Sequence, residues 1–364
     1  MGSASRLLIA AGGTGGHLYP AIAVAERFRD LARDAVIVFV GTERGLESRI
    51  VRKAGYPLEL VRATPLRGGT LSTKLKGLLG LASGLFDAFR VLGRVKPTIV
   101  FGVGAYVSGT VLLAAALRGL PTLILEPNAE PGLANRWLAP FVDEAACAWE
   151  ETTRFFGKKA VVTGNPVREE IAAVPPLASQ SAERMRVLVF GGSQGSVVLN
   201  RAMVASLASL AADFGRLEIT HQTGASHYET VRAAYATLAL RARVTPYIDD
   251  MAEAYRSADV VVARAGATTC AELAASGRGA VLVPLAIAGG HQARNAEMMA
   301  RAGAARWIPE RELDGDRLGV ELRALLEAPE TRAAMASAAR KLARPSAATD
   351  VAHRLVSLEK EAAA

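Results

Sequence analysis

A chain of 364 residues is long for a single hydrophobic core and favours two domains, and half of its residues are apolar, enough for two sizeable cores. Its two cysteines, Cys147 and Cys270, are too few for a disulfide framework or a zinc cluster, which favours a reducing compartment. The net charge of +8 raises the question of nucleic acid, but basic and aromatic residues are not interleaved and no nucleic-acid motif occurs, so we expect no such partner.

The first expected element is a strand over 7–11, an apolar run typical of a parallel sheet buried on both faces. It is too short for a signal peptide. Glycines follow at 12, 13, 15 and 16, and then a helix with one apolar stripe made by Ala21, Val24, Ala25 and Phe28. This arrangement gathers unpaired N–H groups and predicts a site for an anionic or polar ligand. Such a glycine loop occurs both in dinucleotide-binding proteins and in sugar-nucleotide-binding proteins. His17 precedes the helix start that we expect near Pro20.

Strands and helices alternate through the rest of the first half. Further strands are expected over 35–40, 98–101, 122–126 and 160–163, with helices over 47–53 and 110–117 and a loop entering a helix at 131–137. This alternation predicts a parallel, doubly wound sheet. The uncharged segment 98–117 is long enough to span a bilayer, but Gly102, Gly104 and Gly109 interrupt it. A strand, a glycine turn and a helix explain it better.

A basic and apolar stretch lies between residues 62 and 96. Its basic members, opposed only by Asp87, are Arg62, Arg67, Lys74, Lys76, Arg90, Arg94 and Lys96. Its apolar members are Leu71, Leu75, Leu78, Leu79, Leu81, Leu85, Phe86 and Phe89. A basic amphipathic stretch of this type can lie on an anionic membrane surface. An ordinary core helix with a solvated basic face shows the same pattern, and both interpretations stay open.

The same unit restarts after a polar junction at 175–181. A strand over 185–190, a glycine loop over 191–195 and an apolar helix stripe at Leu199, Met203, Leu207 and Leu210 predict a second, similar domain facing the first. More strands are expected over 217–220, 243–244, 260–263 and 280–283, and the alanine-rich tail over 331–361 is expected to be helical and broken at Pro345.

Two stretches of the second half carry candidate chemistry. In 259–272, N–H groups around Gly266, Ala267 and Thr268 are placed to hold a diphosphate at a helix start, and Glu272 to accept hydrogen bonds from ribose hydroxyls. The pair Thr269 and Glu272 fits a capping box equally well. The polar residues of 289–295 are placed to face a sugar, although an exposed helix start would look the same.

Motifs along nearly the whole chain resemble those of the MurG family, the GlcNAc transferases that make lipid II in peptidoglycan synthesis. They are 12–20, 102–109, 126–128 with 131–132, 164–168, 191–195, 248–251, 265–272, and His291 and Gln292 with Asn295. The resemblance implies a glycosyltransferase fold of the B type, an α/β architecture of two doubly wound, Rossmann-like parallel-sheet domains facing across a cleft. Residues 1–165 would form the acceptor and membrane-facing domain and 166–345 the UDP-GlcNAc-binding domain, with a helix over 346–364 packing back on the first.

The implied reaction is an inverting transfer of GlcNAc from UDP-GlcNAc to the 4-hydroxyl of MurNAc in undecaprenyl-pyrophosphoryl-MurNAc-pentapeptide, lipid I. The resemblance implies neither a cofactor nor a catalytic metal. The protein would act at the cytoplasmic face of the bacterial membrane, as a peripheral protein on an anionic surface, beside other proteins of cell-wall synthesis.

The resemblance also implies roles for individual residues. Thr14, Gly15 and Gly16 would line the cleft from the N-terminal side, Asn128 would contact the donor sugar, and Arg168 and Ser193 would contact diphosphate or uridine. Ile248 would read uracil through its backbone, Ala267, Thr268, Thr269 and Glu272 would hold phosphates and ribose, and Gln292 would bind GlcNAc hydroxyls. The chain departs from the family pattern at Ala105, Thr110, Leu125, Pro127 and Gly290.

His17 is the expected catalytic base, because the attacking hydroxyl must lose a proton and acceptor-side carboxylates are scarce in the N-terminal motifs. The rival role is structural, with the ring holding the shape of the glycine loop. Other functions compatible with the fold are a UDP-GlcNAc 2-epimerase, a diacylglycerol glycosyltransferase, and a regulator that binds a nucleotide sugar without turnover. His17 together with the basic stretch favours lipid-linked transfer.

Overall fold

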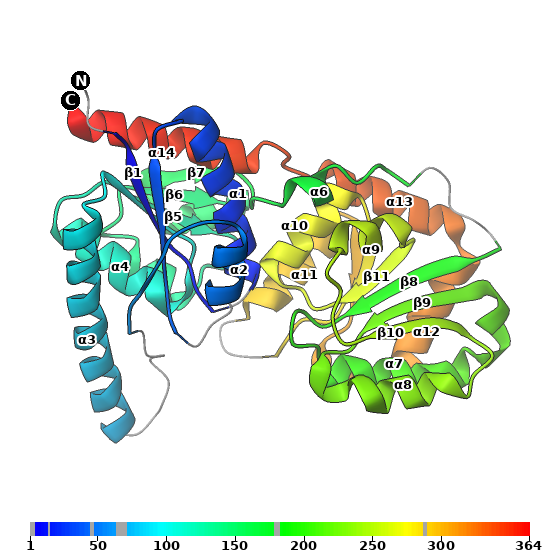
Figure 1. The fold of residues 1–364 in the computed structure, drawn as a ribbon. Helices are drawn as coiled ribbons and strands as arrows, with labels where there is room; N and C mark the ends of the chain where they lie inside the picture. Colours follow the sequence, from blue (N-terminus) through cyan, green and yellow to red (C-terminus); the bar gives the residue numbers. More distant parts are fainter. Residues whose placement is uncertain (1–3, 14, 44–46, 63–70, 178–182, 287–289) are drawn as a thin grey trace. The chain divides into compact units, whose positions relative to one another are not determined.

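The computed structural model describes residues 4–13, 15–43, 47–62, 71–177, 183–286 and 290–364, with only the backbone of 71–79 and 105. The chain divides into two compact units (Figure 1). Unit 1 comprises Met1–Arg168 and Pro345–Ala364, and unit 2 comprises Glu169–Arg344. Each contains one sheet whose strand pairs are all parallel. The predicted α/β class, with two doubly wound parallel sheets, is confirmed.

The sheet of unit 1 reverses its strand order between β1 and β4. Its order is β3 (Leu58–Leu60), β2 (Val36–Gly41), β1 (Arg6–Ala10), β4 (Ile99–Gly102), β5 (Thr122–Glu126), β6 (Glu144–Cys147) and β7 (Ala160–Val162). Ligands of open α/β sheets bind beyond the carboxyl ends of the strands at such a switch point. The segments that follow β1 and β4 carry His17 and Gly104, so the topology brings these residues to one place.

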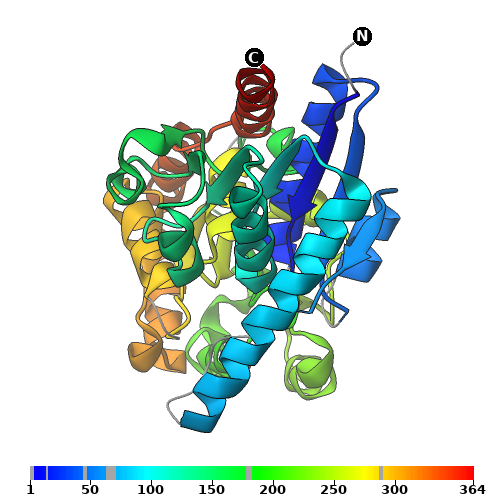
Figure 2. The same ribbon diagram turned by 90° about the vertical axis from the view of Figure 1, so that its left-hand side faces the viewer.

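Helices cover both faces of this sheet (Figure 2). On one face lie α1 (Gly15–Leu31), α2 (Glu47–Lys53) and α14 (Ala347–Ala363), and on the other lie α3 (Leu71–Val95), α4 (Ala105–Leu117) and α5 (Leu133–Leu138). The predicted stripe on α1 is buried throughout. Helix α14 packs against α1, and Arg354 on α14 binds Glu144 on β6 with Nε 2.8 Å from Oε2.

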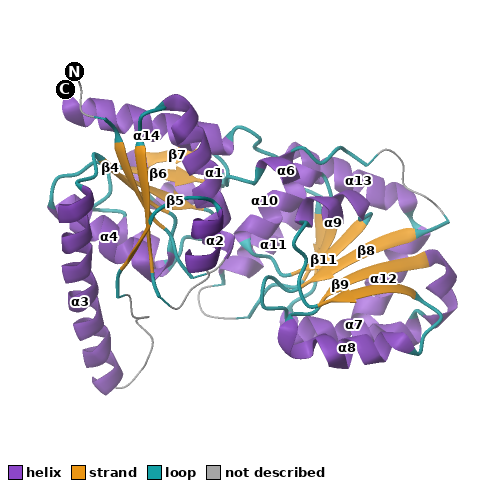
Figure 3. Cartoon of the chain, in the orientation of Figure 1, coloured by secondary structure: helices purple, strands orange, loops and turns teal. Residues whose placement is uncertain are grey.

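Unit 2 repeats the plan (Figure 3). Its sheet order is β10 (Arg241–Thr245), β9 (Leu217–Gln222), β8 (Met185–Phe190), β11 (Val260–Ala263), β12 (Gly279–Leu282) and β13 (Ala305–Trp307). One face carries α7 (Val197–Ser209), α8 (Tyr228–Ala236) and α12 (Gly315–Glu327). The remaining helices are α6 (Glu169–Ala172), α9 (Met251–Ser257), α10 (Ala267–Ser276), α11 (His291–Arg301) and α13 (Pro329–Lys341). Tyr255 of α9 meets Phe190 of β8 edge to face, so α9 lies on the opposite face.

Several boundaries differ from the prediction. Helix α1 begins at Gly15, so Pro20 lies inside the helix and His17 lies in its first turn rather than ahead of it. Helix α4 begins at Ala105 rather than Thr110, because the turn is made by Gly104 at φ 89° and Gly109 is helical. The strands β3, β6 and β13 were not predicted. The uncharged segment 98–117 forms β4 and α4, and no helix in the described ranges has both the length and the apolar character of a membrane span.

Candidate functional site

His17 lies at the carboxyl end of β1, in the first turn of α1, and its side chain is half-buried. A ring N–H donates to the carbonyl oxygen of Gly12. The ring lies against Gly104, where an added Cβ would stand 3.3 Å from Cδ2 and Nε2. Burial lowers the pKa of His17, while the Gly12 carbonyl and the charge of Glu47 oppose the shift. The imidazole is therefore neutral at pH 7 and able to accept a proton.

Glu47, the first residue of α2, supports the glycine loop from within. Its side chain is fully buried, and Oε1 accepts hydrogen bonds from the Gly13 N–H at 2.9 Å and from the N–H and hydroxyl of Thr42, both at 3.2 Å. A Cβ on Gly12 would stand 2.7 Å from Oε1, and one on Gly41 would stand 2.7 Å from Cγ. The sequence predicted only a helix at Glu47, because nothing local marks its partners.

Asn128 is held by a buried carboxylate at the end of β5. Glu126 Oε1 accepts from the backbone N–H of Asn128 at 2.9 Å and from its side-chain amide at 3.0 Å. Glu126 Oε2 accepts from Gly132 at 3.0 Å and from the amide of Asn135 at 2.8 Å. Desolvation raises the pKa of Glu126, and these hydrogen bonds oppose the shift. The amide of Asn128 is thus oriented before any ligand binds.

Other predicted residues of unit 1 lie near the start of α1. Arg168 places its guanidinium 4.3 Å from the ring centroid of Tyr19, a cation–π contact. Gly15 and Gly16 are the first two residues of α1, and Thr14 lies outside the described residues. The departures at Leu125 and Pro127 are both buried, so these side chains are part of the packing around β5.

The glycine loop of unit 2 carries Ser193 at an exposed position between β8 and α7. Gly195 and Gly224 make close backbone contacts there, since a Cβ on Gly195 would stand 2.0 Å from the Thr223 carbonyl oxygen. Both have positive φ, 76° and 79°, which favours glycine. Ile248 lies half-buried in the segment between β10 and α9.

Helix α10 begins at Ala267, with Gly266 as its N-cap. Ala267, Thr268 and Thr269 therefore form the first turn, where backbone N–H groups lack intrahelical acceptors and suit a phosphate. Thr269 is the third helical residue and not the cap, so the capping-box interpretation of Glu272 is wrong. Glu272 is 6% exposed and accepts a hydrogen bond from the hydroxyl of Tyr255 at 3.1 Å.

The start of α11 holds the third predicted stretch of unit 2. Gln292 Oε1 accepts from the Leu285 N–H at 2.9 Å, and the amide of Asn295 donates to the Ala265 carbonyl at 3.1 Å. Asn295 is fully buried and so supports the residue before Gly266. Gly290, one of the departures from the family pattern, is the N-cap of α11 and has φ 65°. Glycine adopts this left-handed conformation without strain.

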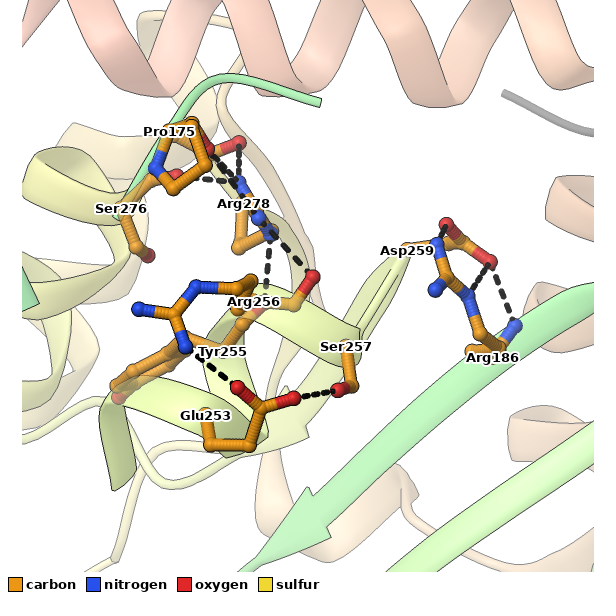
Figure 4. A network of polar contacts seen from close by, with 10 residues as sticks. Pro175, Arg186, Glu253, Tyr255, Arg256, Ser257, Asp259, Ser276 and Arg278 are labelled. Carbon is orange, nitrogen blue, oxygen red and sulfur yellow. Dashed lines mark hydrogen bonds and ion pairs between the residues drawn. The ribbon is translucent and has the colours of Figure 1, made fainter. Parts of the chain in front are cut away.

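Arg278, which the sequence did not single out, ties α9 and α10 to the segment after α6 (Figure 4). Its buried guanidinium donates to the carbonyls of Tyr255 at 2.7 Å, Pro175 at 3.3 Å and Arg256 at 3.4 Å, and also to that of Ser276. These carbonyls include the ends of α9 and α10, where a cation is favourable. Desolvation lowers the pKa of Arg278 to about 10.

Helix α5 and the turn that follows it expose apolar side chains on unit 1. Leu133, Trp137 and Phe141, spaced four residues apart, are 67%, 79% and 52% exposed. Phe86 on α3 is 56% exposed and lies under the guanidinium of Arg90, 4.8 Å from its ring centroid. Helix α4 contacts both α3 and α5, so these side chains belong to one helical layer. Large exposed apolar groups beside cations mark an interaction surface.

No group of three or more His, Cys, Asp or Glu side chains in the described parts of the chain is arranged to hold a metal ion.

Comparisons with known proteins cover both units. Residues 7–147 match the glycosyltransferase family 28 N-terminal domain, and 186–354 match the glycosyltransferase family 28 C-terminal domain. A UDP-N-acetylglucosamine–N-acetylmuramyl-(pentapeptide) pyrophosphoryl-undecaprenol N-acetylglucosamine transferase of Myxococcus xanthus is 44% identical, over 97% of this chain and 93% of its own. One of Stutzerimonas stutzeri is 43% identical over 96% and 97%. The crystal structure of Acinetobacter baumannii MurG superposes with a TM-score of 0.77 at 32% identity, covering 97% of this chain and 99% of the other.

Proposed function

The chain belongs to glycosyltransferase family 28 and, within it, to the MurG family, and on that premise we propose that it transfers GlcNAc from UDP-GlcNAc to the 4-hydroxyl of MurNAc in lipid I. The product is lipid II for peptidoglycan synthesis, formed with inversion. Beyond family membership, the observation that supports this proposal is the neutral, half-buried His17 at the switch point of unit 1. An epimerase or a binding-only regulator needs no base for an incoming hydroxyl.

The proposed chemistry in unit 1 is general-base catalysis. His17 takes the proton of the acceptor hydroxyl while that oxygen forms its bond to the anomeric carbon of GlcNAc, and the bond to UDP breaks. Asn128, already oriented by Glu126, contacts the donor sugar. Arg168 contacts the diphosphate or uridine, its guanidinium steadied by the ring of Tyr19.

The proposed role of unit 2 is to bind the donor. The first turn of α10 holds the diphosphate, and its N–H groups stabilise the charge that develops on departing UDP. Glu272 accepts hydrogen bonds from the ribose, Ile248 reads uracil through its backbone, and Gln292 binds GlcNAc hydroxyls. Ser193 contacts diphosphate or uridine from the exposed loop after β8.

We assign the acceptor and the membrane to unit 1. The exposed apolar side chains of α5 and the turn after it, and the basic stretch over 62–96, suit an anionic bilayer, because apolar groups insert while cations meet lipid headgroups. The protein then acts as a peripheral enzyme at the cytoplasmic face of the cell membrane, in company with other proteins of cell-wall synthesis and division.

The decisive experiment supplies labelled UDP-GlcNAc and a short-chain lipid I analogue. Transfer gives a labelled disaccharide on the lipid together with free UDP. Conversion of UDP-GlcNAc alone to its 2-epimer would show the epimerase instead, and label on added diacylglycerol would show the other transferase. Tight UDP-GlcNAc binding without any turnover would indicate a regulator that binds the nucleotide sugar and is not an enzyme.

A further inference from the structure

The peptide unit between Gly12 and Gly13 has both of its polar groups engaged. Its carbonyl oxygen accepts a hydrogen bond from the ring of His17, and its N–H donates to Glu47 Oε1 at 2.9 Å. A peptide unit is planar and rigid, so a single amide joins the imidazole on α1 to the carboxylate on α2. The two side chains belong to different helices, and this turn lies between them.

We propose that Glu47 is the positioning residue for His17 and acts on it through the Gly12–Gly13 peptide. The proposal rests on the proposed role of His17 as the base that deprotonates the acceptor hydroxyl. Glu47 touches neither substrate nor the reacting atoms in this scheme. It holds the Gly12–Gly13 peptide so that the Gly12 carbonyl faces the ring nitrogen that carries the hydrogen, and it supplies the negative charge that favours the protonated ring.

The burial of the Glu47 carboxylate indicates that it has a functional role. The side chain is 0% exposed, and Oε2 is buried with no hydrogen-bond partner among the described residues. A buried carboxylate with one oxygen unsatisfied destabilises a fold. The surroundings are nevertheless built around it, because Gly12 and Gly41 leave the space that Oε1 and Cγ occupy. Gly104 likewise leaves space for the ring of His17.

The relay assists the chemical step without moving a second proton. When one ring nitrogen takes the hydroxyl proton, His17 becomes a cation and the N–H on the other nitrogen becomes a stronger donor to the Gly12 carbonyl. Hydrogen bonds in a chain polarise one another, so the bond from the Gly13 N–H to Glu47 strengthens as well. The new positive charge therefore forms within reach of the charge of Glu47, which favours the protonated ring.

Among the groups near His17, Glu47 is the one whose charge a substitution should remove to test the proposal. Glu47 on α2 is the side chain whose charge raises the pKa of His17. On α1 the nearest titratable neighbour in the sequence is Tyr19, which carries Arg168 over its ring, and on α4 it is Tyr106. The guanidinium of Arg168 is thus the other charge near the start of α1, and the test leaves it unchanged.

The test compares Glu47→Gln with a matched control, Glu43→Gln, which removes the same charge from an exposed position four residues away. For Glu47→Gln we expect the chemical step, measured in single turnovers with both substrates saturating, to fall roughly 10–100-fold, the loss seen when the outer partner of a metal-binding histidine is changed. UDP affinity should match wild type. The pKa of His17, followed by NMR of the labelled ring, should move further down, and the acid limb of the kcat/KM profile should move with it.

Lowered thermal stability with an unchanged His17 pKa and chemical step would overturn the proposal. Wild-type protein provides a measurement that needs no variant. With labelled glycine and histidine, the amide signal of Gly13 should titrate with the same midpoint as the His17 ring, and a Gly13 signal that ignores that titration would also overturn it. These signals do not depend on turnover, so a failure of the relay is distinct from a failure of the proposed transferase activity.

Discussion

Tyr255 donates its phenolic hydrogen to Glu272 across 3.1 Å, and both side chains are buried between α9 and α10. The hydroxyl therefore orients a carboxylate one turn behind the helix start that we assign to the diphosphate. Tyr255 itself is fixed by its edge-to-face contact with Phe190, at 6.1 Å between ring centroids. The position of Glu272 is thus set by the core of unit 2 and not by capping its own helix.

Replacing Glu272 with Gln should weaken UDP binding at least tenfold, because a charge-assisted hydrogen bond to ribose contributes roughly 1.5–3 kcal/mol. Isothermal titration with UDP measures the change, and Glu253→Gln, on the exposed side of α9, serves as the control. If Glu272 only pairs with Tyr255, then Glu272→Gln and Tyr255→Phe will both lower the melting temperature and leave UDP affinity intact.

Replacing His17 with Ala should slow the chemical step by roughly 10²–10⁴, the usual contribution of a general base, while donor affinity stays near wild type. Because burial lowers the pKa of His17 from 6.5, wild-type kcat/KM should be level at pH 7 and decline only in more acid solution. His353→Ala, an exposed position on α14, controls for loss of an imidazole. A chemical step within a few-fold of wild type would leave His17 a structural residue of the glycine loop.

Changing Trp137 and Phe141 to Ser should weaken binding to neutral and anionic vesicles alike, because the lost interaction is apolar. Changing Lys74 and Lys76 to Glu should weaken binding to anionic vesicles alone and in low salt above all, since each basic residue near the surface contributes about 1 kcal/mol. Vesicle co-sedimentation measures both effects. Turnover of a soluble acceptor analogue should survive in both variants. Binding that ignores lipid charge and salt would refute the electrostatic part.

Acid should destabilise unit 2 through His221. This fully buried ring contacts the Tyr235 hydroxyl at 3.2 Å and Asn200 Oδ1 at 3.1 Å, and desolvation lowers its pKa to about 4. The unfolded chain binds a proton near pH 6.5 and the folded one near pH 4, so stability is complete above pH 6.5 and falls by about 3 kcal/mol on the way down to pH 4. Urea unfolding across this range should lose that part of its pH slope in His221→Gln and keep it in His353→Gln.

Elements with a strong local pattern were predictable and the others were not. The strands β5, β8 and β11 and the helix α2 have the predicted bounds. Strand β6 was missed because it is short and begins with the charged Glu144, whose partner Arg354 lies about two hundred residues later in the chain. Only part of β10 was predicted, because this edge strand exposes Arg241, Ala242 and Arg243 and lacks an apolar run.

The candidate site divides in the same way. Its glycine loops and helix starts are local, so the sequence placed His17 and the first turn of α10 close to where the structure has them. Three residues support them. Glu47 and Tyr255 contact residues that are distant in the sequence, and folding brings these partners together. Glu126 contacts residues that are close in the sequence, but its motif did not suggest these hydrogen bonds. Which polar side chains are buried, and which groups they hydrogen-bond, can be seen only once the packing is known.

Because α14 packs against α1, unit 1 can finish folding only after α14 has been synthesised. Unit 2 is, in topological terms, an insertion between the first 168 residues of unit 1 and the helix that completes it. At 5–20 residues per second, a ribosome needs roughly 10–35 s to pass from that point to α14. Throughout this interval the side of α1 that α14 later covers faces solvent or a chaperone, while every residue of unit 2 is made and able to fold. The half of the protein that is begun first is therefore the half that is finished last.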